Sequence, residues 1–181
     1  MKPTVVLEGL TGEAILRALL PPELLKACHL KPIAPRSTLV SVARTHLVKN
    51  HAPTAVMFDT DTLNPTIISE RIQTTRYLMA DAAGDTPFDI IYSIPHIEAI
   101  FFEDTTALQR IFPQFDNFFL LRFAKTQPKD QLQLLFEKGG GPKTLNAFLD
   151  QLASDDIEKL RVSYPIQHVM AFITNNTTIT A

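Results

Sequence analysis

The chain is poor in cysteine and has no large excess of charge of either sign. Cys28 is the one cysteine among 181 residues, which excludes an internal disulfide framework and a multi-cysteine zinc site and suits a reducing compartment. The 17 lysines and arginines nearly balance the 19 aspartates and glutamates, so the sequence has neither a basic arm nor an acidic tail. Any contact with nucleic acid must therefore come from a local patch or a bound metal ion, not from net charge.

Long apolar runs are missing as well. No run approaches the roughly 20 residues that span a bilayer, and Glu8 interrupts the apolar run near the N-terminus, unlike in a signal peptide. We therefore expect a cytoplasmic protein without membrane association. The length and the 45% content of hydrophobic residues predict one domain with a core of its own.

Short apolar runs alternate with helical spacing in the first half of the chain. The β-branched run at 4–7 and the apolar run at 54–58 are the clearest strands. Pro32 weakens the strand at 30–34, and Ser37 is the predicted N-cap of the helix that follows it. Strands are predicted at 4–7, 30–34, 54–58 and 88–92, and helices between Gly12 and Pro21, at 23–27, from Ser37 to about Asn50 and at 67–82.

This alternation predicts an α/β fold, with a mostly parallel four-stranded sheet covered by helices on both faces. Beyond residue 95 the pattern is mainly helical. We therefore expect an α/β core at 1–104 and a helical C-terminal extension at 105–181 that packs on the same domain. Helices in this later part are predicted at 97–103, 107–112, 130–138, 143–152, 154–161 and 166–173.

Acidic side chains follow three of the predicted strands. Glu8 comes after the first strand, Asp59 and Asp61 after the third, and Glu98 shortly after the fourth. Ligands of open parallel sheets collect at this carboxyl edge. In an extended segment, residues two apart point the same way, so Asp59 and Asp61 are expected to present both carboxylates to one Mg²⁺ ion, which favours oxygen ligands and phosphate substrates.

A lone pair of aspartates at the end of a strand often serves only to cap a turn. Glu8 favours the functional interpretation, because an acid that ends a buried strand has little reason to be there for stability. Glu98 is the weaker candidate, since a short helix could expose it to solvent.

The segment Val6-Leu7-Glu8-Gly9 with Thr11, followed by an apolar strand that ends in Asp59-Thr60-Asp61, resembles the Toprim domain. That domain occurs in topoisomerases, primases and OLD-type (overcoming lysogenization defect) nucleases. The segment at 94–104, with its proline, acids and aromatic residues, is similar to a further motif of small, largely uncharacterised Toprim-like proteins related to the OLD-type nucleases.

The resemblance covers residues 4–104 and implies a Toprim-like fold and roles for the acids. It implies that Glu8 is the general acid/base of phosphoryl transfer, that Asp59 and Asp61 bind Mg²⁺ or Mn²⁺, and that Glu98 contributes to a second metal site. Two metal ions would stabilise both the attacking and the leaving oxygen of a phosphodiester.

Two positions depart from the pattern of these relatives. Gly12 stands where they commonly carry an acid, and Glu13, one residue later, is the remaining candidate ligand. His96 stands where they often carry a glutamate, and it could act as a proton shuttle or metal ligand. Both departures leave a weakened site open as an alternative.

Basic residues gather in the later half, near Phe118, Phe119 and Phe123. Lys125 and Lys129 are the best candidates for contact with a nucleic-acid backbone, although a solvated surface over an aromatic core is the commoner meaning of such a cluster. Arg122, Lys138 and Lys143 belong to the same basic group.

No nucleotide-binding loop is encoded at the glycines 139–141. Pro142 occupies the place where that motif requires glycine before the Lys-Thr pair, so a glycine stop between two helices explains the segment better. If ATP is involved, a partner such as an ATPase would have to supply its site.

Three functions follow from these residues. The first is a Mg²⁺-dependent nuclease that cleaves phosphodiester bonds in DNA or RNA, with a place in phage defence implied by the resemblance alone. The second is a weakened Toprim-like subunit that binds nucleic acid or a partner such as an ATPase and acts as a sensor. The third, ranked lowest, is a phosphatase of the haloacid-dehalogenase type, suggested by the segment 58–63. Homo-oligomer formation stays open.

Overall fold

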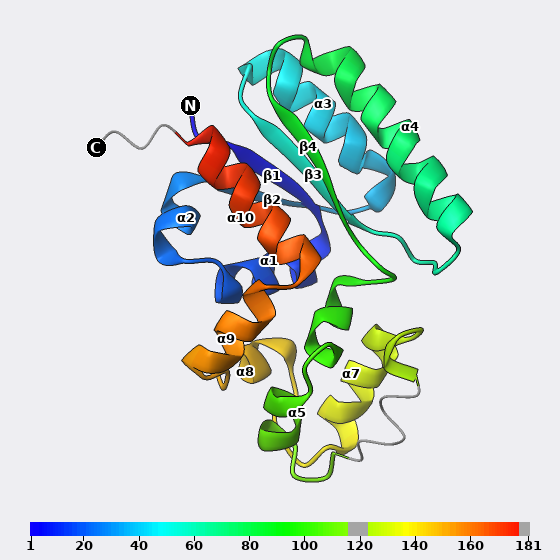
Figure 1. Cartoon of the computed structure of the whole chain (residues 1–181), viewed down its shortest axis with the longest axis vertical. Helices are drawn as coiled ribbons and strands as arrows, with labels where there is room; N and C mark the ends of the chain where they lie inside the picture. Colours follow the sequence, from blue (N-terminus) through cyan, green and yellow to red (C-terminus); the bar gives the residue numbers. More distant parts are fainter. Residues whose placement is uncertain (116–122, 178–181) are drawn as a thin grey trace.

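The computed structural model describes residues 1–115 and 123–177, which form an α/β fold around one four-stranded sheet (Figure 1). Every strand pairing is parallel, and the order is β2-β1-β3-β4. The predicted mostly parallel sheet is thereby confirmed. The strands are β1 (Thr4–Glu8), β2 (His29–Ile33), β3 (Thr54–Asp59) and β4 (Phe88–Ser93).

Helices cover both faces of the sheet and continue beyond its carboxyl edge (Figure 1). The helices of the first half are α1 (Gly9–Leu19), α2 (Pro22–Ala27), the 3₁₀ helix η1 (Arg36–Thr38), α3 (Leu39–Asn50) and α4 (Pro65–Ala83). The later helices are the 3₁₀ helix η2 (Ile97–Phe102), α5 (Thr106–Ile111), α7 (Pro128–Lys138), α8 (Leu145–Leu149), α9 (Ser154–Arg161) and α10 (Tyr164–Asn176).

Alternate residues of the strands face two different apolar cores. Val5 and Leu7 of β1 belong to the core beneath α1 and α10, whereas Val6 belongs to the core beneath α3 and α4. Side chains on both faces are buried, because a parallel sheet is covered on each side. This explains why β3 reads as a continuous apolar run, with Ala55 to Phe58 all buried.

The helical C-terminal part lies beyond the carboxyl edge of the sheet, and its last helix returns to the sheet (Figure 1). α10 packs against β4, and Ile166 and Val169 of α10 are fully buried in the same core as Leu7. The residues on either side of position 104 therefore share one apolar core. Across the described ranges, no helix combines the length and apolar character needed to cross a bilayer.

The structure corrects two predicted helix starts. α1 begins at Gly9, directly after β1, instead of after Gly12, because the positive φ of Gly9 (67°) allows the sharp turn from strand to helix. Ser37 is not the N-cap of α3: it lies inside η1, and Thr38 takes the cap position. Pro32 does fit within β2, since this strand is at the edge of the sheet, where a missing N–H is tolerated.

Candidate functional site

The carboxyl edge of the sheet brings three of the predicted acids together. Glu8 is the last residue of β1, and Asp59 is the last residue of the neighbouring strand β3. The backbone N–H of Asp59 donates a hydrogen bond to Glu8 Oε2 at 3.3 Å. Asp59 Oδ1 in turn accepts a hydrogen bond from the backbone N–H of Ile97 at 2.9 Å, which places η2 and its Glu98 against the strand end.

The charges of these acids act on one another. Burial, the largest cause, and the nearby carboxylates of Glu98 and Glu8 together raise the pKa of Asp59 to about 7, against the opposing effects of the Ile97 N–H bond and the positive charge of Lys129. Carboxylates held this close in a buried site resist ionising together. A divalent cation between them would remove that conflict.

Glu98 is the most deeply buried of the predicted site residues. Its side chain is only 4% exposed, and its Oε2 has no hydrogen-bond partner among the described residues. A buried carboxylate oxygen without a partner is unfavourable by several kcal/mol unless a cation or a donor reaches it. The expectation that a short helix could expose Glu98 to solvent is therefore wrong.

A small cavity lies between the acids of β1 and β3. Its volume is about 10 Å³, and its lining includes Glu8, Gly12, Asp59 and Ile97. This is roughly the space of one water-sized sphere. Gly12 is buried here, and a Cβ atom at this position would lie 3.2 Å from Leu7 Cδ1. Packing against Leu7 thus explains why a larger side chain, including an acid, is not accommodated without movement.

Asp61 does not extend the alternation of β3, so the prediction that its carboxylate points the same way as that of Asp59 is wrong. The strand ends at Asp59, and Asp61 has a positive φ of 51°. The carboxylate of Asp61 forms an ion pair with Arg36, and its Oδ1 lies 3.2 Å from His96 Nε2. The backbone N–H of Asp61 is held by the carbonyl oxygen of Pro95 at 2.9 Å.

Arg36 is the site residue that the sequence analysis missed. Its guanidinium group contacts Asp61, lies 3.5 Å from Glu8 Oε2 through Nε, and sits over the ring of Phe58, with 5.7 Å between Cζ and the ring centroid. A signal was available: Arg36 follows β2, and in a parallel sheet the segment after every strand reaches the same edge. The weakness of the β2 pattern concealed it.

The remaining predicted residues lie in different surroundings. Glu13 forms an ion pair with Arg17 on α1, with 2.7 Å between Oε1 and Nη2, so its carboxylate already has a partner. Lys125 and Lys129 are exposed, and of the two Lys129, in the first turn of α7, acts on the charge of Asp59. The predictions for Phe118, Phe119 and Arg122 concern positions outside the described residues.

The donor chemistry fits a hard cation, although the ligands are not gathered into a closed cage. Within residues 1–115 and 123–177, no three His, Cys, Asp or Glu side chains are grouped closely enough to hold a metal ion between them. Mg²⁺ does not need such a cage, because it keeps several waters and takes one or two carboxylates plus substrate oxygens. Glu8, Asp59 and the unpartnered oxygen of Glu98 offer that donor set.

Known proteins give no further guide to this site, since no family model, no curated protein and no solved structure matches the chain. The case for a function therefore rests on the geometry of the carboxyl edge.

Proposed function

We propose that this protein is a divalent-metal-dependent phosphodiesterase of the Toprim type, a nuclease that cleaves DNA or RNA with Mg²⁺ or Mn²⁺. One observation carries the proposal: the charges of Glu98 and Glu8 both act on the partly buried Asp59 at the carboxyl edge, and the buried Oε2 of Glu98 has no partner among the described residues. Such an arrangement is unfavourable for the protein alone and favourable once a cation is bound.

The acids would have different roles, according to how deeply each is buried. Asp59 and Glu98, which are the more buried, would hold the cation, which supplies charge neutralisation for the phosphoryl group when it is bound. Glu8 is the more accessible, with 27% of its side chain exposed, and it would move a proton to or from the reacting oxygen. Lys125 and Lys129 would contact the backbone of the substrate strand.

Arg36 adds a fixed positive charge to the same edge. Its guanidinium group already contacts two carboxylates, and it could exchange them for the non-bridging oxygens of a phosphodiester, which match its fork of donors. In that arrangement Arg36 would orient the phosphate, and the acids would be left free for the cation.

Cleavage assays test this proposal directly. The purified chain is incubated with single- and double-stranded DNA and RNA, with Mg²⁺ or Mn²⁺ and with EDTA. We expect metal-dependent cleavage that falls by about 100-fold or more in Glu8→Gln and in Asp59→Asn, because general acid/base groups and metal ligands each contribute at this level. Asp150→Asn, an exposed acid remote in sequence from the site, is the matched control. Cleavage that survives both site substitutions would overturn the proposal.

A second candidate function is a weakened Toprim-like subunit that binds nucleic acid or a partner such as an ATPase. The ion pair of Asp61 with Arg36 and its contact with His96 Nε2 favour it, because they engage an expected metal ligand. Calorimetry distinguishes the two functions: nucleic-acid binding without any binding of Mg²⁺ or Mn²⁺ would support the subunit. An acid-labile phosphate on Asp59 would instead support a phosphatase of the haloacid-dehalogenase type. A place in phage defence is implied by the resemblance alone and is proposed for either Toprim-like function on that ground.

A further inference from the structure

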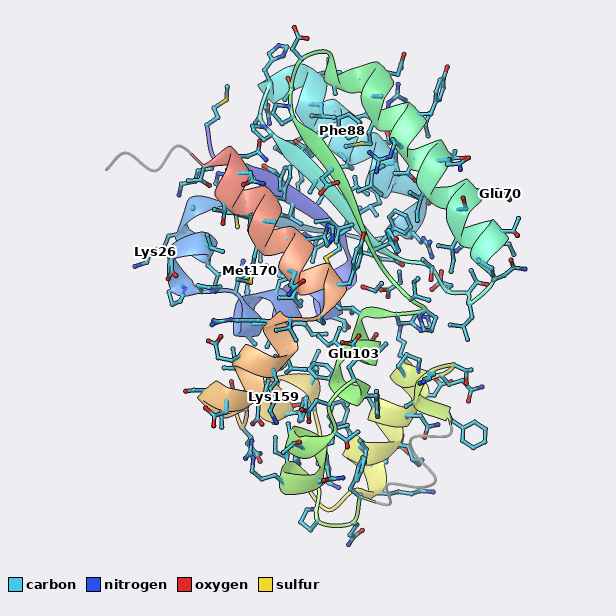
Figure 2. All side chains as sticks on the ribbon, in the orientation of Figure 1. Lys26, Glu70, Phe88, Glu103, Lys159 and Met170 are labelled. Atoms are coloured by element: carbon cyan, nitrogen blue, oxygen red, sulfur yellow. The ribbon has the colours of Figure 1, made fainter. Side chains whose placement is uncertain are left out.

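A second cavity lies beside the acids, between the end of β4, η2 and the start of α10. Its volume is about 270 Å³, and its lining includes Tyr92, Ser93, His96, Ala99, Glu103 and Tyr164. Figure 2 shows Glu103 at the end of η2, where the sheet meets the helical part. The cavity shares no lining residue with the small space between Glu8 and Asp59, so the two are separate.

Two buried polar atoms of this cavity have no partner among the described residues. Ser93 is 4% exposed, and its Oγ makes no hydrogen bond to any described residue. The buried Nδ1 of His96 also lacks a hydrogen-bond partner among these residues. Native proteins leave few such atoms unpaired, since each is unfavourable for folding. Both atoms belong to residues in the lining of the cavity, just beneath its surface, so a small movement of the two side chains would bring them to a polar ligand there.

Aromatic rings also line the cavity. The ring centroids of Tyr92 and Tyr164 are 5.0 Å apart, and the ring of Tyr164 continues onto His168 at 4.1 Å. Tyr164 is 39% exposed, so part of its ring is free to meet a ligand. A flat ligand stacks on such a surface, and a nucleobase does so whatever its sequence identity.

Glu103 supplies an acceptor at the rim. Burial raises the pKa of its carboxyl group, which is the expected behaviour of an acid that lies partly inside a cavity. A flat ring that carries both amino donors and acceptor nitrogens or oxygens at its edge would match Glu103, Ser93 and His96 together. Nucleobases have this edge chemistry, and proteins read it on bases that have left the stack.

His96 joins this cavity to the acids. Its Nε2 lies 3.2 Å from Asp61 Oδ1, while its Nδ1 is one of the two unpaired buried atoms among the lining residues. The larger groove between α3 and α4, of about 790 Å³, also reaches the acids through Arg36, but none of the residues in its lining carries an unpartnered buried atom within the described ranges. The cavity between β4, η2 and α10 is therefore the better candidate for a specific ligand site.

We propose that the cavity between β4, η2 and α10 binds one unpaired nucleobase of the substrate strand, next to the phosphodiester held at the acids. The inference rests on the proposed function and makes it specific, because a paired base inside a duplex could not enter a space of this size. The substrate class is therefore single-stranded nucleic acid, or a strand with an unpaired nucleotide.

Binding of single-stranded oligonucleotides tests this site. The probes are a fluorescent 12-nucleotide DNA strand and a series of the same strand in which each nucleotide in turn lacks its base. Fluorescence anisotropy measures the affinity of the protein for each strand, in EDTA so that no cleavage occurs. In the wild-type protein we expect one position in the series to bind about tenfold more weakly, near the lower end of what a stacked base contributes. In Ala99→Leu, which fills the cavity, all members of the series are expected to bind equally weakly.

Controls separate the cavity from folding and from the metal site. Ala80→Leu places the same side chain on the exposed surface of α4 and should leave the series unchanged. Ser93→Ala, which removes one polar atom and little volume, should reduce the effect of the missing base by a few-fold. Thermal unfolding establishes that each variant is folded.

The outcomes are distinct. A wild-type protein that binds the whole series equally, or a missing-base effect that persists in Ala99→Leu, would overturn the inference. A free nucleoside monophosphate that binds as tightly as the strand, and loses binding in Ala99→Leu, would overturn it in favour of a site for a free nucleotide. If the missing-base effect is found but no metal-dependent cleavage occurs, the proposed function fails and the base site stands.

Discussion

Two buried acids show how differently the sheet edge and the helical part use a carboxylate. Asp156, near the start of α9, is 7% exposed, and its Oδ2 accepts a hydrogen bond from the backbone N–H of Ala153 at 2.8 Å and an ion pair from Arg110. Glu98, in η2, is equally buried, yet its Oε2 has no partner among the described residues.

The difference separates a structural acid from the acid that we propose to be functional. Asp156 satisfies a free N–H at a helix start and is itself satisfied by Arg110, so its burial supports the fold. The charge of Glu98 helps to raise the pKa of Asp59, and its own Oε2 has no partner among the described residues, so its burial opposes the fold of the protein alone. Burial therefore does not distinguish the two roles, whereas the presence of partners does.

Replacing Glu98 should have the largest effect. In Glu98→Gln we expect metal-dependent cleavage to fall by about 100-fold, since a ligand is lost, while the metal-free protein becomes more stable because repulsion with Asp59 is removed. Cleavage rates and urea unfolding in EDTA measure the two changes. A variant that is less stable and fully active would show that Glu98 behaves like Asp156.

Replacing Asp156 should give the reverse profile. Asp156→Ala leaves the N–H of Ala153 without its acceptor and the guanidinium group of Arg110 without its partner, so we expect the free energy of unfolding to fall by about 2 kcal/mol. Cleavage at a temperature where the variant is folded should stay within about twofold of the wild type. Asp155→Ala, an exposed neighbour, is the control for helix α9.

The pH dependence of stability should report the repulsion among the carboxylates at the carboxyl edge of the sheet. The pKa of Asp59 is about 7 in the folded protein against an ordinary value of 3.8, so the folded state binds more protons than the unfolded state between about pH 4 and pH 7. Stability of the metal-free protein therefore falls as the pH rises through this window. The groups that face Asp59 are Glu98, Glu8, the N–H of Ile97 and Lys129.

The comparison with Asp59→Asn isolates this contribution. We expect the wild type to lose about 1–2 kcal/mol more than the variant between pH 4 and pH 7, less than the full shift would give because water reaches Asp59 in part. Urea unfolding at both pH values measures it. Parallel pH profiles for the two proteins would contradict the raised pKa.

Arg36 should have the smallest effect on metal binding. Its guanidinium group contacts Asp61 and Glu8, so in Arg36→Met we expect Mn²⁺ to bind a few-fold more tightly, because a competing cation is removed. Cleavage should nevertheless fall, since the phosphate loses its donor. Weaker Mn²⁺ binding in this variant would mean that Arg36 mainly positions the acids.

The sheet and most helices were predictable because their signals are local. The apolar run of β3 and the alternation of strands and helices follow from burial on both faces of a parallel sheet. The predicted cap at Ser37 and the predicted start of α1 were wrong because η1 and Gly9 adopt tight turns that periodicity does not reveal.

The site was predictable to the extent that it depends on the sheet. Glu8 and Asp59 end neighbouring strands, so topology alone brings them together. The position of Asp61 could not be predicted, because it depends on a positive φ beyond the strand and on contacts with Arg36 and His96 that are distant in sequence. The unpartnered atoms of Glu98 and Ser93 also require the tertiary structure.

The most direct test is a calorimetric titration of the metal-free protein with Mn²⁺, alongside Asp59→Asn and Asp156→Asn. If the carboxyl edge is a cation site, the wild type and Asp156→Asn bind Mn²⁺ with a saturable isotherm, and Asp59→Asn binds at least tenfold more weakly. Equal binding by all three proteins, or no saturable binding by the wild type, would contradict a metal site at Glu8, Asp59 and Glu98.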